Sequence, residues 1–219
     1  MELKYSIVRK RVKNLRITIK NTWDIIVSSP WFYTKGQIDK VVMAKKDWIE
    51  KKLKKFENNG DILDTEPGKI IYFGDKYDFI LDEKLKSDNI DTENKSITSK
   101  MDLSKESNLN SWYKKKAKEY LTRRTEELIA EHSFKVGKIT VRSQKTRWGS
   151  CSAKNDISLN SALLKCPSWV IDYVIYHELA HTVQKNHSKS FWDLVGRYVS
   201  DYKELRNWLK KHWGKLIVP

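Results

Sequence analysis

Regular spacing of apolar residues near the start of the chain predicts a hairpin followed by a helix. Between residues 15 and 20 every second residue is apolar, which is the period of a half-buried strand. Residues 4–9 have the same β character, and residues 24–27 predict the hairpin partner of this strand. From residue 37 to residue 56 the apolar spacing becomes that of an amphipathic helix, with lysines on the opposite face.

The rest of the chain combines short strands with longer helices. Residues 69–73 and 76–81 predict a strand pair, whereas the polar, acidic residues 82–110 predict edge hairpins or a loose connection. Further strands are expected at 136–142 and 156–160, and helices at 111–132, 169–183, 188–199 and 202–213. This mixture predicts an α+β protein with a β-rich, basic N-terminal region containing one helix, residues 1–106, and a second domain, residues 107–219.

Charge is unevenly distributed along the chain. The 219 residues carry a net charge of +15, to which residues 1–56 contribute +10, residues 57–110 contribute −6 and residues 111–219 contribute +11. Basic stretches attract phosphates and other anionic surfaces. Lysine dominates the basic set, however, and arginine is the residue that phosphate and base recognition favour. A nucleic-acid interface and a solvated lysine-rich face are therefore both open for the basic segments.

Composition excludes several classes of protein. The two cysteines, Cys151 and Cys166, are too few for a disulfide framework, and we expect both to be buried, reduced thiols. The N-terminal segment lacks the apolar core of a signal peptide, and no stretch approaches the roughly 18 apolar residues of a membrane span. Nine Trp, ten Tyr and six Phe argue against disorder. We therefore expect a folded cytoplasmic protein with no membrane segment.

The most specific signal is the sequence His177-Glu178-Leu179-Ala180-His181 in an apolar helical stretch. Residues four apart lie on one helix face with Cβ atoms about 5–6 Å apart, so both imidazoles can reach one metal ion. Glu178 is offset by about 100° and can approach a water molecule on the metal without being a ligand. A carboxylate in this place can accept the proton of the water. Histidines satisfied by hydrogen bonds in a core are the weaker alternative, because burying these groups without a metal is costly.

A third ligand is expected, because zinc enzymes normally use three protein ligands and keep one position open. The candidates are His187, His132, His212 and the acidic residues downstream, and His187 follows His181 at the spacing found in metzincins. Gln184 replaces the turn glycine of that class, and no methionine follows the site. The other two histidines are expected at helix ends on the surface. Three acidic residues are candidates to orient a ligating imidazole by accepting a hydrogen bond from the ring nitrogen that does not bind the metal, namely Asp193, Asp201 and Glu204.

An ordered set of short motifs resembles the YgjP-like metallopeptidase family. It comprises Arg-Trp-Gly-Ser-Cys at 147–151, Ile-Ser-Leu-Asn at 157–160, Tyr-Val-Ile-Tyr-His-Glu-Leu-Ala-His at 173–181, Asn-His-Ser at 186–188 and Phe-Trp at 191–192. The resemblance covers almost the full length and is weakest over residues 82–110. It implies a zincin-like metallopeptidase domain over residues 107–219.

The resemblance also implies roles for four residues. His177, His181 and His187 would bind zinc, and Glu178 would act as general base. SprT-like and WLM proteases, which act on proteins bound to DNA, share a similar site motif with a downstream histidine. Some relatives in the family are described as nucleotide pyrophosphohydrolases, so the resemblance leaves the reaction open.

We expect zinc-dependent hydrolysis of peptide bonds in a peptide or protein substrate, with one zinc ion per chain. The alternatives are a metal-dependent nucleoside triphosphate pyrophosphohydrolase and a DNA-associated protease or nucleic-acid-binding module. The chain lacks a phosphate-cradling glycine loop, which counts against the first alternative. Two segments compete as the strand edge that would pair with an extended substrate, residues 156–160 and residues 147–151. In the second segment, Gly149 would allow another backbone to approach closely. The alternative for this segment is a packing motif, with Trp148 in the core and Gly149 in a tight turn.

Overall fold

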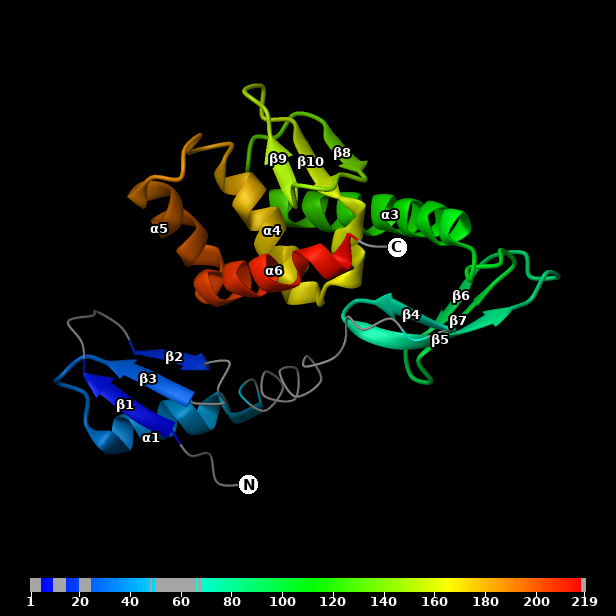
Figure 1. Cartoon of the computed structure of the whole chain (residues 1–219). Coiled ribbons are helices and arrows are strands. Elements are labelled where there is room, and N and C mark those ends of the chain that lie inside the picture. The colour runs from blue at the N-terminus through cyan, green and yellow to red at the C-terminus, as the bar shows by residue number, and fades with distance from the viewer. Residues whose placement is uncertain are drawn as a thin grey trace. The chain divides into compact units, whose positions relative to one another are not determined.

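The computed structural model describes residues 5–9, 15–19, 25–47, 49, 66 and 68–217 of the chain (Figure 1). It divides into two compact units, Met1–Asp61 and Ile62–Pro219. The division expected between residues 106 and 107 does not coincide with this split. Side chains from both sides of that position, such as Ile97 and Trp112, are buried in one shared core.

The first unit contains a three-stranded sheet in the order β1-β3-β2. Strand β3 (Ile25–Ser29) pairs in parallel with β1 (Tyr5–Arg9) and antiparallel with β2 (Arg16–Ile19). The antiparallel pair confirms the hairpin predicted from the alternating apolar positions. The hydrophobic core of this unit consists of aliphatic residues, namely Ile25, Val27, Ile38, Val42 and Ile49.

Helix α1 (Lys35–Ala44) follows the sheet and begins at a capping box. The Thr34 hydroxyl accepts a hydrogen bond from the backbone N–H of Gln37, and the Gln37 side chain accepts one from the backbone N–H of Thr34. The helix predicted from residue 37 is confirmed up to residue 44. Residue 48 and residues 50–56 of that prediction lie outside the described residues.

The second unit begins with a four-stranded sheet in the order β4-β5-β7-β6. Strands β4 (Lys69–Tyr72) and β5 (Asp75–Leu81) form the predicted antiparallel pair. Strands β6 (Asn89–Asp91) and β7 (Ser96–Ser99) form a hairpin within residues 82–110, which decides between the two expectations for that segment.

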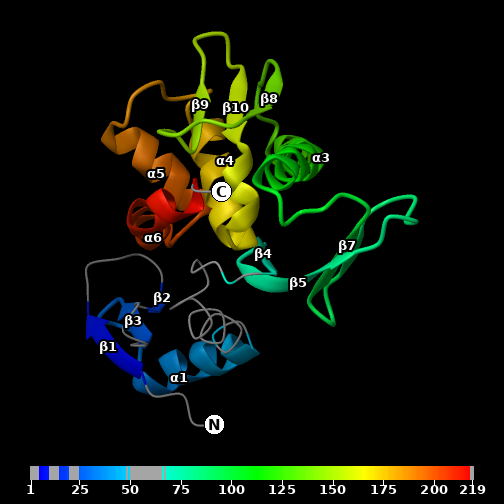
Figure 2. The ribbon, with the colours of Figure 1, turned by 45° about the vertical axis from the view of Figure 1, so that its right-hand side comes forward.

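The remaining elements of the second unit form the C-terminal part that carries the histidine motif (Figure 2). They are α3 (Glu106–His132), β8 (Ile139–Arg142), β9 (Gly149–Cys151), β10 (Ile157–Asn160), the 3₁₀ helix η1 (Ser161–Lys165), α4 (Ser168–Ala180), α5 (Lys189–Tyr198) and α6 (Tyr202–Leu216). Strands β8, β10 and β9 form a sheet in that order, with β10 in the centre. The predicted α+β fold is confirmed. No helix among the described residues is long and apolar enough to cross a membrane.

Helix α4 lies at the centre of this part and contacts β9, α5 and α6. Its sequence is apolar on nearly all sides, and Val170, Ile171 and Ile175 are fully buried. A polar anchor fixes the helix against α3, because the guanidinium of Arg124 donates to both carboxylate oxygens of Asp172 at 2.8 and 3.0 Å. Helix α4, which carries the His-Glu-x-x-His motif, is therefore held by packing on several sides.

Candidate metal centre

The chain turns sharply where α4 ends, and this turn determines where the third histidine lies. The helix ends at Ala180, earlier than the predicted residue 183. The Thr182 hydroxyl donates to the carbonyl of Leu179 at 2.7 Å, and the N–H of Gln184 donates to the carbonyl of Ala180 at 2.8 Å. The chain then runs to Ser188, which caps the start of α5.

Three imidazoles meet beside this turn. His177 and His181 lie one turn apart at the end of α4, and His187 comes from the segment before α5. One ring nitrogen from each lies within 4.8 Å of the others. The Nε2 atoms of His177 and His187 are 3.1 Å apart. Ligands of one tetrahedral zinc ion, bound at about 2.0–2.1 Å, lie about 3.3 Å from each other, so this separation fits a shared ion.

Aromatic side chains of α5 support the three imidazoles. The Phe191 side chain is fully buried, with ring centroids 4.9 Å from His177 and 4.4 Å from His181. Trp192 stacks on His187 at 5.4 Å with an interplanar angle of 22°. Phe191 and Trp192 thus pack α5 against the end of α4, and this packing restricts the rotation of the imidazoles.

The environment keeps the imidazoles neutral, which is the form that binds metal. Burial, followed by the neighbouring imidazoles and Arg206, lowers the pKa of His177 to about 3. Burial also lowers the pKa of His181 and that of His187. A donor set of neutral imidazoles at neutral pH suits Zn²⁺ and similar ions.

One imidazole is oriented by the main chain. His181 Nδ1 lies 3.1 Å from the carbonyl oxygen of Gln184, and this contact leaves Nε2 facing the cluster. The partner is thus a carbonyl, not one of the acidic candidates Asp193, Asp201 and Glu204. His177 Nδ1 is buried and has no hydrogen-bond partner among the described residues. A buried, unpaired ring nitrogen is costly, and a ligand on the opposite nitrogen would explain why this imidazole is retained there.

Glu178 lies beside the imidazoles in a confined place. The side chain is only 4% exposed, and burial raises its pKa to about 8. Its carboxyl group lies against Gly149 of β9, where an added Cβ would be 2.7 Å from Oε1 and 2.8 Å from Cγ. The space that a Cβ would occupy at Gly149 is taken by the Glu178 side chain, and the approach of another backbone to this segment stays a prediction. The glycine therefore makes room for the carboxylate of the motif.

The free strand edge beside the site belongs to β9. The expectation that residues 156–160 provide this edge is wrong, because β10 is paired on both sides, with β8 and with β9. The competing segment, 147–151, contains the edge strand. The N–H of Ser152 donates to the carbonyl of Asp156, and the N–H of Asn160 donates to that of Trp148. Because antiparallel hydrogen bonds alternate, the main-chain groups of residues 149 and 151 point away from β10.

The other candidate residues lie elsewhere or differ from expectation. His132 Nε2 lies 2.9 Å from the Tyr176 hydroxyl, and the His212 ring lies 4.7 Å from that of Trp208, so neither belongs to the cluster. Both cysteines are free thiols. Cys166 is fully buried as predicted, whereas Cys151 is only half-buried because it lies on the edge strand. Lys51, Lys52, Lys54 and Lys55, which belong to the basic N-terminal segment, lie outside the described residues.

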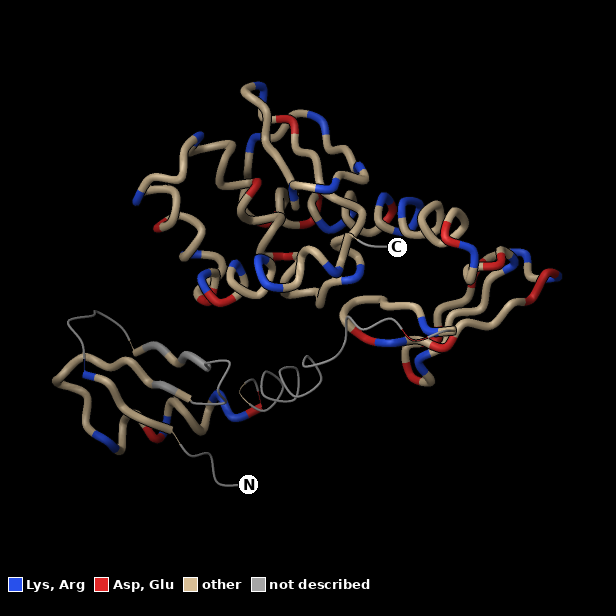
Figure 3. The backbone as a smooth tube through the Cα atoms, in the orientation of Figure 1, with Lys and Arg blue, Asp and Glu red and all other residues tan. Residues whose placement is uncertain are grey.

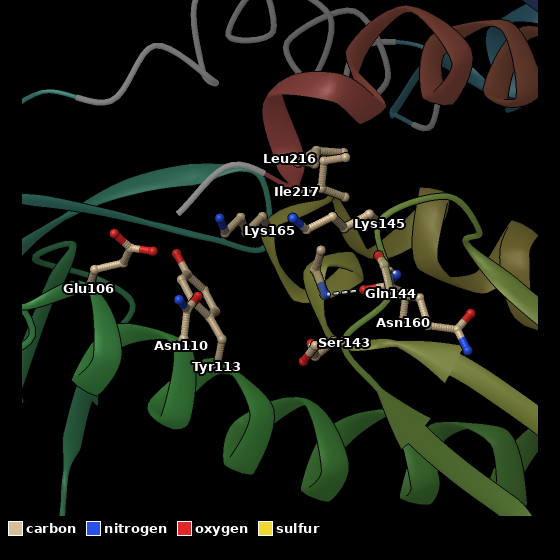
Figure 4. Close-up of a pocket in the computed structure, with 12 residues that line it drawn as sticks. Glu106, Asn110, Tyr113, Ser143, Gln144, Lys145, Asn160, Lys165, Leu216 and Ile217 are labelled. Atoms are coloured by element: carbon tan, nitrogen blue, oxygen red, sulfur yellow. Dashed lines mark hydrogen bonds between the residues drawn. The ribbon is translucent and has the colours of Figure 1, made fainter.

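A cavity of about 620 Å³ lies away from the histidines (Figure 4). Its walls come from α3, the segment before β9, η1 and the end of α6, and they include Tyr113, Gln144, Asn160 and Lys165. The Asn160 side chain donates to the carbonyls of Gln144 and Arg147 at 2.6 and 2.8 Å, which fixes the chain leading into β9. Neither Glu178 nor a histidine lines this cavity, so the candidate metal chemistry lies outside it.

Sequence reasoning missed two residues next to the site, Tyr202 and Arg206. Tyr202 stacks on Trp192 at 5.1 Å, and the Arg206 guanidinium carbon lies 5.0 Å from the centre of a Trp192 ring. The only signal for this pair was its spacing of four residues, which places both on one face of the last helix.

A buried His-Glu-x-x-His helix with a third histidine from the following segment defines a zincin-type metallopeptidase domain. The chain belongs to the YgjP-like family, whose metallopeptidase-domain model matches residues 13–212. This confirms the resemblance seen in the motifs, and membership implies a metal-dependent hydrolase. No curated protein and no solved structure matches the chain.

Proposed function

We propose that this protein is a zinc-dependent metallopeptidase that hydrolyses peptide bonds. The observation that carries the proposal is the cluster of three neutral imidazoles with the Glu178 carboxyl group beside it, next to the free edge of β9. His177, His181 and His187 would hold one zinc ion per chain. When bound, zinc supplies a Lewis acid that activates a water molecule and polarises the scissile carbonyl.

Glu178 would act as general base and then as general acid. Its carboxylate would accept the proton of the attacking water and pass it to the leaving amine nitrogen. Burial supports the second step, because an apolar environment favours the protonated carboxyl group. The contact with Gly149 fixes where the carboxylate can lie, so the proton is exchanged at a defined position.

Strand β9 would bind the substrate backbone. The outward N–H and carbonyl groups of residues 149 and 151 can pair with an extended peptide, as an added strand pairs with a sheet edge. A peptide held in this way runs past Glu178, because β9 contacts α4 at the same place. Strand pairing recognises the main chain of a peptide, which favours a peptide substrate over a nucleotide.

The test is a substrate screen combined with metal analysis. Peptides, DNA-bound proteins and nucleoside triphosphates would be offered to the zinc-loaded wild type and to Glu178→Gln. We expect peptide cleavage that falls by at least about 10²-fold in Glu178→Gln, while the zinc content stays near one ion per chain. His177→Ala and His181→Ala should lose the metal. Hydrolysis of triphosphates without peptide cleavage, or loss of zinc from Glu178→Gln, would overturn the assignment.

A further inference from the structure

We propose that Arg206 forms an anion subsite beside the metal-binding histidines and selects peptides that carry a carboxylate close to the cleaved bond. The inference rests on the proposed peptidase function and adds a class of substrate to it. It concerns α6, an element that the zinc site itself does not use.

Stacked rings hold Arg206 next to the site. Trp192 lies on His187, Tyr202 lies on Trp192 with an interplanar angle of 13°, and the Arg206 guanidinium lies over the same indole. This guanidinium and the His187 imidazole of the candidate metal cluster therefore both lie against the indole of Trp192. Cation–π contact with an indole favours a defined position for the guanidinium plane.

The hydrogen-bonding groups of Arg206 are available. The side chain is exposed, and it has no hydrogen bond or ion pair with any residue that the structure describes. The contrast is Arg124, whose guanidinium is used by both carboxylate oxygens of Asp172. A cation–π contact needs none of the five N–H donors as hydrogen-bond partners, so these donors can bind a carboxylate in a bidentate pair.

The charge of α6 also favours an anion on this side of the site. Helix α6 has five basic residues and one acidic residue, as Figure 3 shows along its length. An anionic group of a substrate would therefore be attracted to this side of the site.

The position of Arg206 relative to β9 determines which group of the substrate can reach it. Helix α4 lies between β9 and α6 in both ribbon views (Figures 1 and 2). A peptide paired with β9 would have to extend a group across the end of α4. That group can be an Asp or Glu side chain or the free carboxyl terminus, which share one chemistry. A carboxylate is favoured over a phosphate, because no glycine-rich phosphate loop accompanies Arg206 in the sequence.

The test compares wild type with Arg206→Gln, Arg206→Lys and the control Lys203→Gln. Lys203 lies on the same helix and is also exposed, and its ammonium group lies over Tyr202 at 5.9 Å. Removing it takes away one positive charge but leaves the stack on Trp192 intact. The substrates are peptides blocked at both ends that carry Asp or Asn at each position near the cleaved bond, and one set with a free carboxyl terminus.

We expect the wild type to prefer Asp over Asn by about tenfold in kcat/KM at one position, or to prefer the free terminus by the same factor. Arg206→Gln should lower this ratio to near one, Arg206→Lys should retain part of it, and Lys203→Gln should keep it. The zinc content should stay the same in all four proteins. An unchanged ratio in Arg206→Gln, or an equal loss in Lys203→Gln, would overturn the subsite.

A binding measurement separates this proposal from the proposed function. Zinc-loaded Glu178→Gln protein would be titrated with a fluorescent Asp-containing peptide, with and without Arg206→Gln. About tenfold weaker binding in the double variant supports the subsite even if no peptide is cleaved, whereas equal binding overturns it. ATP is the competitor. The contrary outcome is that ATP displaces the peptide at lower concentrations than a matched Asp peptide does, and only in protein that has Arg206. That result would overturn the choice of a carboxylate over a phosphate.

Discussion

Gly149 should control the position of the Glu178 carboxylate, and Gly149→Ala tests this directly. The added Cβ would lie 2.7 Å from Oε1, 2.8 Å from Cγ and 3.0 Å from Cδ of Glu178. Unbonded carbon atoms prefer about 3.5–4.0 Å, so the carboxyl group or β9 has to move by about 0.5–1 Å. The buried Glu178 side chain has little free space into which it can withdraw.

The expected cost falls mainly on the reaction. Overpacking of this kind costs about 1–3 kcal/mol of stability, which the melting temperature reports as a fall of several degrees. Misplacement of a reacting group by about 1 Å can cost about 10²-fold in rate. We expect kcat/KM to fall by about 10- to 100-fold. Zinc content should stay near one ion per chain, because none of the three atoms that the new Cβ meets belongs to a histidine.

Two comparisons make the reasoning refutable. Gly214→Ala in α6 is the control, because an added Cβ there meets no atom within 4 Å, and activity should stay at the wild-type level. In the Glu178→Gln background, Gly149→Ala should cost almost no further activity, because both changes act through the same carboxyl group. Wild-type activity in Gly149→Ala, loss of its zinc, or additive losses in the double variant would each refute the assigned contact.

Three further predictions follow from other parts of the second unit. Burial raises the pKa of Asp88, but hydrogen bonds from Ser99 and Lys116 outweigh it and hold that pKa below its usual value. The ionised Asp88 side chain therefore stabilises the folded protein fully above its pKa in the unfolded chain, which is about 3.9. This contribution is lost as the pH falls through the lower pKa of Asp88 in the folded protein. Asp88→Asn should cost about 1–2 kcal/mol in chemical denaturation at pH 7, and the difference from wild type should disappear at acid pH. Iodoacetamide should modify half-buried Cys151 and not fully buried Cys166, and mass spectrometry would identify the modified residue. Modification of Cys151 should inhibit peptide cleavage, because the added group would block the free edge of β9. Chelation of the metal should lower the melting temperature by about 5–10 °C, restored by zinc, whereas an unchanged value would contradict metal binding by the folded state.

Local patterns were sufficient to predict most helices and strands. The alternation at residues 15–20 and the apolar spacing at 202–213 each report burial on one side of an element, and both elements form where they were expected. The ends were less predictable. Helix α3 begins at Glu106, before the predicted residue 111, and its first three residues, 106–108, are polar, so no apolar residue marks its start.

Strand order could not be predicted from the chain, because it depends on pairing between distant segments. Residues 157–160 have alternating apolar residues, and residues 149–151 form a short strand with no such pattern. The clearer pattern belongs to the central strand, since burial on one face and pairing on both edges favour β-branched and aliphatic residues. An edge strand next to a reaction site has the opposite requirement, namely small residues and unpaired main-chain groups.

The same distinction explains why the motif residues were predictable and their surroundings were not. Chemistry that depends on spacing along one helix, such as two imidazoles four residues apart, can be read directly from the sequence. The contact of Glu178 with Gly149 joins residues 29 positions apart, and the stack from His187 through Trp192 to Arg206 joins three separate segments. Neither has a local signature, because a glycine or an exposed arginine has many other uses. The first contact determines where the Glu178 carboxylate lies, and the second holds the Arg206 guanidinium beside His187, so both features depend on tertiary packing that the motif does not contain.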